Sequence, residues 1–323
     1  MAMGIFEQLA WLTTKVKRLC CALDILKKEV DANKEANPCY LEITKTSGGS
    51  FPYATLSEYN ANTDWDTPFT GLVIVGDSIQ RLYGGSNVYL SNIFQGNPDI
   101  TSINDGCGVV TGIGSAAFEQ CTSLTYVNLP VITVIPFTAF YRCNLLSYFN
   151  APLVTNIGDS AFEESGLGSI DFPLLTTAGN ASFRNCSLVT SINLPLLQTI
   201  DQGCFTGLVN FAEVLNLPEL LSAPQFSFNN MNNCLGYNFP KVQATGYGCF
   251  SDSCVSSSGD LTFNLKSCTD LGGTVGDDAV WGSLTSKIVT LTIPSVLMTC
   301  NSGAPDGDIQ YLQLNNTVTI IIV

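Results

Sequence analysis

Residues 113–130 read IGSAAFEQCTSLTYVNLP, and residues 135–152 and 157–173 repeat the pattern as IPFTAFYRCNLLSYFNAP and IGDSAFEESGLGSIDFP. A phenylalanine marks the centre of each unit, at steps of 21 to 23 residues: Phe118, Phe140, Phe162, Phe183, Phe205, Phe228 and Phe250. A fixed period near 22 is typical of a solenoid, in which each unit is too small to bury its own apolar face and stacks on its neighbours.

Each unit contains two extended segments. In residues 124–129 apolar and polar side chains alternate, which is the pattern of a half-buried strand. Pro130 then ends the strand, because proline has no N–H to give to a sheet. A second short apolar segment follows, as in residues 153–157, and a Gly/Asp/Ser corner leads to the phenylalanine. We therefore expect a coil with a strand, a second short extended piece, and a turn or short helix that carries the phenylalanine.

The consensus I-G-x-x-A-F-x-x-C-x-x-L-x-x-I-x-L-P resembles the leucine-rich repeats of the BspA-like type, over residues 92–254 when a degenerate first coil near Phe94 is included. Proteins of that family occur on bacterial surfaces, in protist surface proteins and in some phage proteins, and most serve adhesion. The resemblance implies a β-rich leucine-rich-repeat solenoid that binds a partner, and it does not specify the ligand.

The composition argues against two classes of function. The 323 residues carry a formal net charge of −14, whereas binding to a phosphate backbone needs clustered Lys and Arg. The chain has no histidine, which removes the usual general base and the commonest metal ligand. No repeated pair of carboxylates is present that would suit glycoside hydrolysis. We expect no enzyme activity, no cofactor, no metal site and no nucleic-acid partner.

The thirteen cysteines do not show the spacing of a metal site, and three of them follow the repeat. Cys121, Cys143 and Cys186 each lie three residues after a repeat phenylalanine, where Ser165 and Leu208 stand in other units. A position that accepts Cys, Ser or Leu is a packing position, and no C-x-x-C pair is present for zinc. The sequence predicts reduced, structural thiols.

Near the amino terminus, the spacing between apolar residues alternates between four and three positions: Ile5, Leu9, Leu12, Val16, Leu19, Leu23, Leu26 and Val30. This spacing predicts a coiled-coil seam, and apolar flanking positions favour three strands, with a dimer as the other possibility. An amphipathic helix folded onto the solenoid of its own chain is the alternative. The stretch LTTKVKRLCC (residues 12–21) also resembles the amino-terminal anchors of structural proteins from phages of Bacteroides and Flavobacterium. We expect neither a signal peptide nor a membrane span here.

The chain is expected to have four regions. Residues 1–38 form the oligomerisation or anchoring helix and a linker, and residues 39–91 form a β-rich amino-terminal cap. The solenoid occupies residues 92–255, and residues 256–323 form a carboxyl-terminal cap that ends in the strand TVTIIIV. This apolar strand should be buried against the last coil or a neighbouring subunit. Asp306-Gly307-Asp308 is expected to be a turn.

Strand alternation predicts a polar column on the outer face of the repeat strands. A stack of amides flanked by aromatic rings suits sugar or protein contacts, although asparagines also bond to one another in purely structural ladders. The candidate ligand residues on this face are Tyr126, Asn128, Tyr148, Asn150, Asp171 and Asn193.

Together these features favour a structural virion appendage of a phage, a head or tail fibre assembled in the host cytoplasm. In this interpretation the amino-terminal helix joins identical chains and contacts other virion proteins, and the solenoid serves host-surface adhesion, through a glycan or protein, or acts as a spacer. The alternative is a cellular surface adhesin or protein-interaction module.

Overall fold

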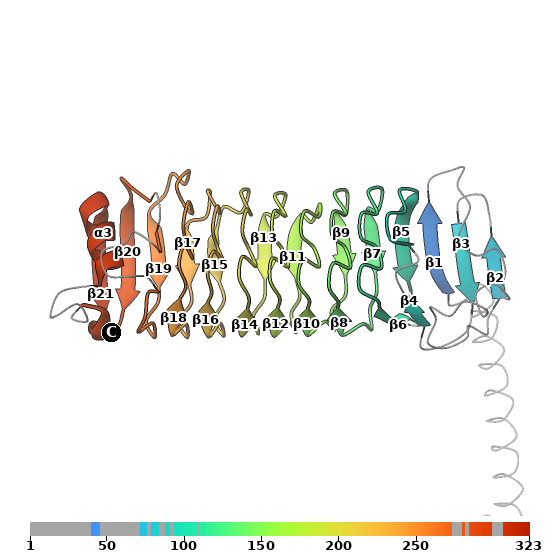
Figure 1. Ribbon diagram of the computed structural model, residues 1–323, viewed down its shortest axis with the longest axis horizontal. Helices are drawn as coiled ribbons and strands as arrows, with labels where there is room; N and C mark the ends of the chain where they lie inside the picture. Colours follow the sequence, from blue (N-terminus) through green and yellow to red (C-terminus); the bar gives the residue numbers. More distant parts are fainter. Residues whose placement is uncertain are drawn as a thin grey trace, which may run out of the picture. The chain divides into compact units, whose positions relative to one another are not determined.

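The computed structural model describes residues 40–45, 72–75, 79–83, 88–90, 94–106, 108, 110–272, 280–281, 284–298 and 306–323. The chain divides into two compact units, Met1–Tyr40 and Leu41–Val323. The seam from Ile5 to Val30 lies in the first unit and outside the described residues. The second unit is a stack of coils, as the repeat predicts (Figure 1).

Two parallel rows of strands run along the stack, because most coils contribute one strand to each row. The first row consists of β5 (Ile100–Asp105), β7 (Tyr126–Asn128), β9 (Tyr148–Asn150), β11 (Ser169–Asp171), β13 (Ser191–Asn193), β15 (Val214–Asn216), β17 (Gly236–Asn238), β19 (Leu261–Asn264), β20 (Ile288–Ile293) and β21 (Thr317–Ile322). The second row consists of β4 (Val88–Leu90), β6 (Val110–Ile113), β8 (Val134–Ile135), β10 (Asn156–Ile157), β12 (Thr177–Ala178), β14 (Thr199–Ile200), β16 (Ser222–Ala223) and β18 (Ala244–Thr245).

Antiparallel strands cover the first coil. β1 (Tyr40–Lys45) pairs antiparallel with β5, and the sheet continues outward through β3 (Ile79–Tyr83) to β2 (Leu72–Val75). A β-rich segment before the repeats is thus present, and it closes an edge that the first coil would otherwise leave open. The division of the chain into four domains at the expected boundaries stays a prediction.

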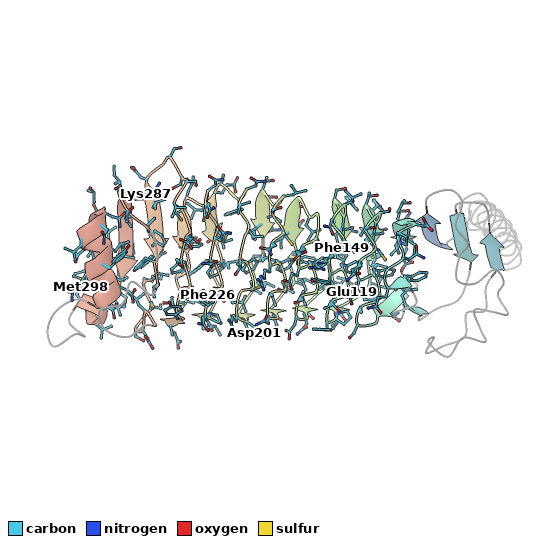
Figure 2. All side chains as sticks on the ribbon, turned by 45° about the horizontal axis from the view of Figure 1, so that its top comes forward. Glu119, Phe149, Asp201, Phe226, Lys287 and Met298 are labelled. Carbon is cyan, nitrogen blue, oxygen red and sulfur yellow. The ribbon has the colours of Figure 1, made fainter. Side chains whose placement is uncertain are left out.

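The repeat phenylalanines form one continuous column in the core. Successive rings from Phe94 to Phe250 stack with centroids 5.4 to 5.9 Å apart and planes within 15° of parallel, and Trp281 stacks on Phe250 at 5.3 Å. Phe149, labelled in Figure 2, meets the rings of Phe140 and Phe162 edge-on. Full burial of each such ring contributes roughly 1.5–3 kcal/mol.

The segment that carries each phenylalanine is a run of tight turns. Residues two before and two after the ring adopt left-handed backbone angles, such as Ala116 (φ 56°) and Gln120 (φ 57°). This alternation points every second N–H at the next coil, so that the Phe118 N–H donates to the Ala139 carbonyl at 2.9 Å. The remaining N–H groups close turns within the coil, as from Cys121 to the Phe118 carbonyl at 3.1 Å. The backbone polar groups of the turn face are therefore used within the stack.

The cysteine column is buried and reduced, as expected. Cys121, Cys143 and Cys186 are free and fully buried. Their thiols also donate to the carbonyl of the phenylalanine one coil earlier, at 3.0–3.1 Å. Ser253 makes the same contact to Phe228. The position is thus more than a packing site, since a small donor there bonds adjacent coils.

The carboxyl-terminal region adds helices that the sequence analysis did not predict. A 3-10 helix, η2, spans Ser295–Met298, and α3 spans Gly307–Asn315. The expected turn at residues 306–308 is wrong, because Asp306 is the N-cap of α3 and accepts from the Asp308 N–H at 2.9 Å. Aspartate is a favoured N-cap because its carboxylate satisfies a backbone donor that the helix leaves open.

The terminal strand continues the parallel sheet. β21 pairs with β20 over its whole length, and Val318 and Ile320 pack against the core. Ile321, Ile322 and Val323 are 46%, 55% and 59% exposed in the single chain. The expected pairing against the last coil is present, but burial of the terminal residues is not.

Candidate functional site

Two tyrosines form the aromatic part of the expected ligand face. Tyr126 and Tyr148 are in register on β7 and β9, and their rings stack with centroids 4.6 Å apart and planes 4° apart. Tyr126 is half-buried and Tyr148 is 48% exposed. Desolvation, and then the neighbouring Tyr148, raise the pKa of Tyr126, so this phenol stays protonated at neutral pH. The pair presents aromatic surface with two hydroxyl groups to solvent.

The asparagines beside the tyrosines bond to one another. The side-chain amide of Asn150 donates to Asn128 Oδ1 at 2.8 Å, and Asn128 donates to Asn104 Oδ1 at 2.9 Å. Asn193 donates to Asp171 Oδ1 at 2.7 Å. A third segment joins Asn264, Asn238 and Asn216 at 2.6–2.7 Å. We name these contacts the asparagine ladder, and it binds adjacent coils together through their side chains.

The ladder and the first row of strands are interrupted at the same two places. The sheets end after β9 and after β13, and the ladder has no contact from Asn150 to Asp171 or from Asn193 to Asn216 among the described residues. In most coils the inward residue of the strand follows the phenylalanine by nine positions, as Phe149 follows Phe140. Ile170 on β11 follows Phe162 by eight, and Leu215 on β15 follows Phe205 by ten. One residue fewer or more displaces these strands from their predecessors.

The six predicted ligand residues therefore fall into two groups. Tyr126, Tyr148, Asn128 and Asn150 lie on the paired strands β7 and β9. Asp171 and Asn193 lie together on β11 and β13, beyond the first break. The sequence analysis missed Asn104 and Asn264, which extend the ladder at both ends. The signal for Asn104 was the repeat register itself, because it follows Phe94 by the same ten residues that separate Asn128 from Phe118. Asn264 follows Phe250 by fourteen residues, so the register does not predict it.

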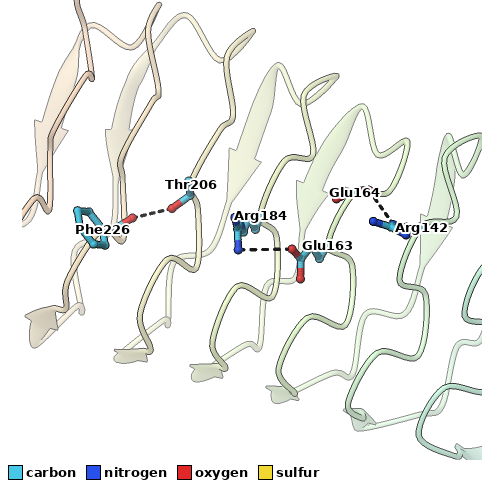
Figure 3. A network of polar contacts seen from close by, with 6 residues as sticks. All are labelled: Arg142, Glu163, Glu164, Arg184, Thr206 and Phe226. Carbon is cyan, nitrogen blue, oxygen red and sulfur yellow. Dashed lines mark hydrogen bonds and ion pairs between the residues drawn. The ribbon is translucent and has the colours of Figure 1, made fainter.

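The turn face of the stack carries charged contacts between coils (Figure 3). Arg142 Nε donates to Glu164 Oε2 at 2.9 Å, and the Arg142 guanidinium lies 4.9 Å from the centroid of the Tyr141 ring. Hydrogen bonding to Glu164 raises the pKa of Arg142. Arg184 Nη1 lies 3.7 Å from Glu163 Oε1, too far for a hydrogen bond. Both pairs are exposed to solvent, which screens them, so they add little to stability.

The described residues contain no group of three or more His, Cys, Asp or Glu side chains that could hold a metal ion. Desolvation raises the pKa of Cys121, Cys186 and Cys204 to about 12, so these thiols are protonated at neutral pH and are poor nucleophiles.

In the part of the chain that the structure describes, every helix is too short or too polar to cross a bilayer.

A stack of parallel coils with an internal phenylalanine column and an outward amide ladder defines a leucine-rich-repeat solenoid. The model of the BspA type leucine rich repeat region matches residues 89–208 and 155–272 with six copies, which is more than half of the chain. The chain belongs to this family, as the consensus predicted. No curated protein matches it.

Two solved structures are similar in fold. A leucine-rich repeat protein from Bacteroides ovatus aligns with a TM-score of 0.52 and 20% identity, over 86% of this chain and 75% of that one. A leucine rich cell surface protein from Faecalibacterium prausnitzii aligns with a TM-score of 0.36 and 18% identity, over 77% of this chain and 86% of its own. At this identity the first likeness establishes the fold alone. These similarities give no support to the resemblance of residues 12–21 to phage proteins.

Proposed function

We propose that this protein is a non-enzymatic adhesion module that binds a surface glycan or protein through the face around Tyr126 and Tyr148. The observation that carries the proposal is the stacked pair of partly exposed rings beside the asparagine ladder. Aromatic faces bind the C–H surface of a sugar or an apolar side chain, and amide and hydroxyl groups fix the orientation of the ligand. The hydrogen-bonded backbone beneath the rings holds them in place before the ligand arrives.

The ladder limits which groups are available to the ligand. Asn128 donates to Asn104 and accepts from Asn150, so its amide is used within the protein. At the end of this segment, the Asn150 Oδ1 has no hydrogen-bond partner among the described residues. We therefore place the polar contacts of the ligand at Asn150 and at the two tyrosine hydroxyls.

The test replaces Tyr126 and Tyr148 with alanine, singly and together, and measures binding to an array of immobilised glycans and to intact cells. Phe137→Ala is the matched control, since Phe137 is a 55% exposed aromatic residue in the coil of β9 but outside the strand face. We expect the double variant to lose binding and the control to keep it. Undiminished binding by a folded double variant would remove this face from the proposal.

We further propose that the chain is an oligomeric virion appendage of a phage, a trimer or a dimer, whose residues 1–38 join the chains and contact other virion proteins. The heptad spacing of Ile5 to Val30 supports this part of the proposal. The mass of the full chain and of a chain that lacks residues 1–38, measured by light scattering, tests it. Monomers in both cases would contradict it.

The alternative setting is the surface of a cell, where the same solenoid would serve as an adhesin. Mass spectrometry of purified phage particles, alongside surface labelling of intact producing cells, separates the two settings. Protein in the particles supports the appendage, and protein labelled on cells without particles supports the adhesin.

A further inference from the structure

One coil of the stack lacks side chains at two outward positions of its turn face. The residues two before and two after Phe205 are Gly203 and Gly207, with φ of +66° and +79°. The coils on either side carry side chains at both positions, Ala181 and Asn185 around Phe183, and Phe226 and Asn230 around Phe228. The surface of the turn face is therefore recessed at this coil relative to the two neighbouring coils.

The backbone does not require glycine at position 203. Ala116, Thr138, Ser160 and Ala181 occupy the same place in their coils with φ of 50° to 56°. A Cβ built on Gly203 would have the Thr206 hydroxyl oxygen 3.5 Å away as its nearest atom within contact range, which is an ordinary distance. What the glycine provides here is open space.

A surface hollow of about 430 Å³ lies at this position. Gly203 lines it together with residues of its own coil and of the coils on both sides: Asn180, Arg184, Gln202, Thr206, Phe226 and Asn229. This volume falls in the range of sites that hold small ligands. The hollow lies on the turn face, whereas Tyr126 and Tyr148 lie on the first row of strands in earlier coils.

The aromatic residue of the hollow stands in a strained place. Phe226 has a left-handed φ of 56°, at a position where the other described coils have alanine, threonine, serine or glycine. A bulky residue rarely adopts this conformation, and such strain is concentrated at functional sites. Gly248 makes room for the ring, because a Cβ there would lie 2.3 Å from Phe226 Cε1. The Tyr247 ring supports it edge-on at 5.6 Å.

The polar groups of the hollow are mostly neutral. The Asn229 amide donates to the Ser251 carbonyl at 2.9 Å, which leaves its Oδ1 as an acceptor. Thr206 Oγ1 donates to the Phe226 carbonyl at 2.7 Å, as Figure 3 shows. The side chains of Asn180 and Gln202 have no hydrogen-bond partner among the described residues. Glu163 lies close enough to Arg184 to balance its charge.

We propose that this hollow binds a neutral hexopyranose unit of a glycan, as a second site independent of the Tyr126 and Tyr148 face. Phe226 gives the hollow an apolar edge, while its ring leans toward Gly248 and Tyr247 of the next coil. The amides of Asn180, Gln202 and Asn229, with the Arg184 guanidinium, bond to the hydroxyls of the sugar. We expect the sugar to be uncharged because Glu163 already balances the charge of Arg184, and because the net charge of −14 on the chain repels an acidic sugar.

The experiment uses the full chain and saturation-transfer difference NMR with glucose, galactose, mannose and N-acetylglucosamine, and with glucuronate as the charged probe. Gly203→Thr fills the hollow with a side chain that Thr138 already shows to fit this backbone. Ala116→Thr makes the matched change in a distant coil. Phe226→Ala removes the ring and also relieves the left-handed strain, so it should not unfold the protein. Thermal unfolding checks each variant.

We expect at least one neutral sugar to bind, with affinity lowered about ten-fold or more by Gly203→Thr, and lowered less by Phe226→Ala, which removes an apolar edge of the hollow. Ala116→Thr and the tyrosine double variant should bind the sugar as the unchanged chain does. Failure of every neutral sugar to bind, or equal loss in Gly203→Thr and Ala116→Thr, would overturn the proposal. Tighter binding of glucuronate than of glucose would overturn its neutral class. If only the tyrosine double variant lost sugar binding, the glycan would bind on the strand face and not in the hollow, and the proposal would be wrong.

Discussion

Phe162 and Phe183 stack one coil apart with ring centroids 5.6 Å apart and planes 2° apart, and both rings are fully buried. The same contact recurs between every pair of neighbouring repeat phenylalanines, so each ring belongs to two coil interfaces. In a solenoid, stability is close to a sum of such nearest-neighbour terms. A change in one ring should therefore act on its own coil and on the two coils that contact it.

Phe162→Ala should lower the free energy of unfolding by about 3–5 kcal/mol, because it removes a buried ring and leaves a cavity between two others. Phe162→Leu should cost less, since most of the apolar volume remains. Leu188→Ala is the control, because Leu188 is 54% exposed and should change stability by no more than about 0.5 kcal/mol. Urea unfolding measures all three. Equal costs for the Phe162→Ala and Leu188→Ala variants would contradict the role of the column.

Asn128→Ala should destabilise the protein more than Asn150→Ala. Asn128 makes two ladder contacts, to Asn104 and from Asn150, whereas Asn150 makes one. At about 1 kcal/mol for each hydrogen bond lost, the two variants should differ by about that amount in urea unfolding. The reverse order, or no difference, would show that the ladder does not stabilise the stack.

The repeat pattern predicts most of the fold because burial and period act together. The spacing of Phe118 to Phe250 predicts the core column, and alternation around Val127 predicts which residues face outward. The period does not predict that Trp281 joins the column, because Trp281 follows Phe250 by 31 residues and the period is lost between them. The ladder breaks where a coil has one residue more or fewer between its phenylalanine and its strand. This change is small in the sequence, and its effect is seen only when the pairing of neighbouring strands is known.

The hollow at Gly203 could not be predicted from the candidate residues. It depends on side chains that are absent from one coil and present in the coil before it and the coil after it, so no chemically reactive residue type marks it. Two glycines at aligned positions were the available signal. Their meaning becomes visible only when the left-handed angles of Ala181 and Phe226 show that side chains fit there.

Gly236→Ala should be more costly than Gly203→Ala. Gly236 has a φ of +131°, and a Cβ there would overlap the backbone of Thr262 on the paired strand β19. Backbone cannot move aside as a side chain does, so we expect a loss of about 2 kcal/mol or more. Gly203→Ala places a methyl group in open space, as Ala181 has in its own coil, and should cost only about 1 kcal/mol, the strain of a left-handed alanine. Thermal unfolding of the two variants measures the contrast, and similar melting temperatures would contradict it.

Cys186 should resist alkylation in the folded protein. Burial raises the pKa of its thiol to about 12, so at pH 8 only about one molecule in 10,000 carries the reactive thiolate. Iodoacetamide should modify it at pH 8 only after unfolding in guanidinium, as peptide mass spectrometry would show. Rapid modification without denaturant would contradict its burial.

The same shift predicts how stability depends on pH. Cys186 and Cys204 have folded pKa values of about 12, above the unfolded value of about 8.5. Their contribution is fully present below pH 8.5 and is lost as the pH rises toward 12, because the unfolded chain is then stabilised by ionisation. The variant Cys186→Ser with Cys204→Ser should show a weaker fall in melting temperature from pH 8 to pH 10.5 than the unchanged chain. An equal fall in both proteins would exclude the thiols as its cause.

Ile321→Lys should reduce self-association of the chain. β21 pairs with β20 on one side, and its other edge has no strand partner among the described residues. Exposed apolar residues at such an edge invite pairing with other chains, and a lysine there opposes it. Leu188→Lys is the matched control, since it exchanges an exposed leucine for the same charge far from the edge. Light scattering during storage at high concentration should show less aggregate for Ile321→Lys alone. An equal decrease in both variants would assign the effect to net charge and not to the edge strand.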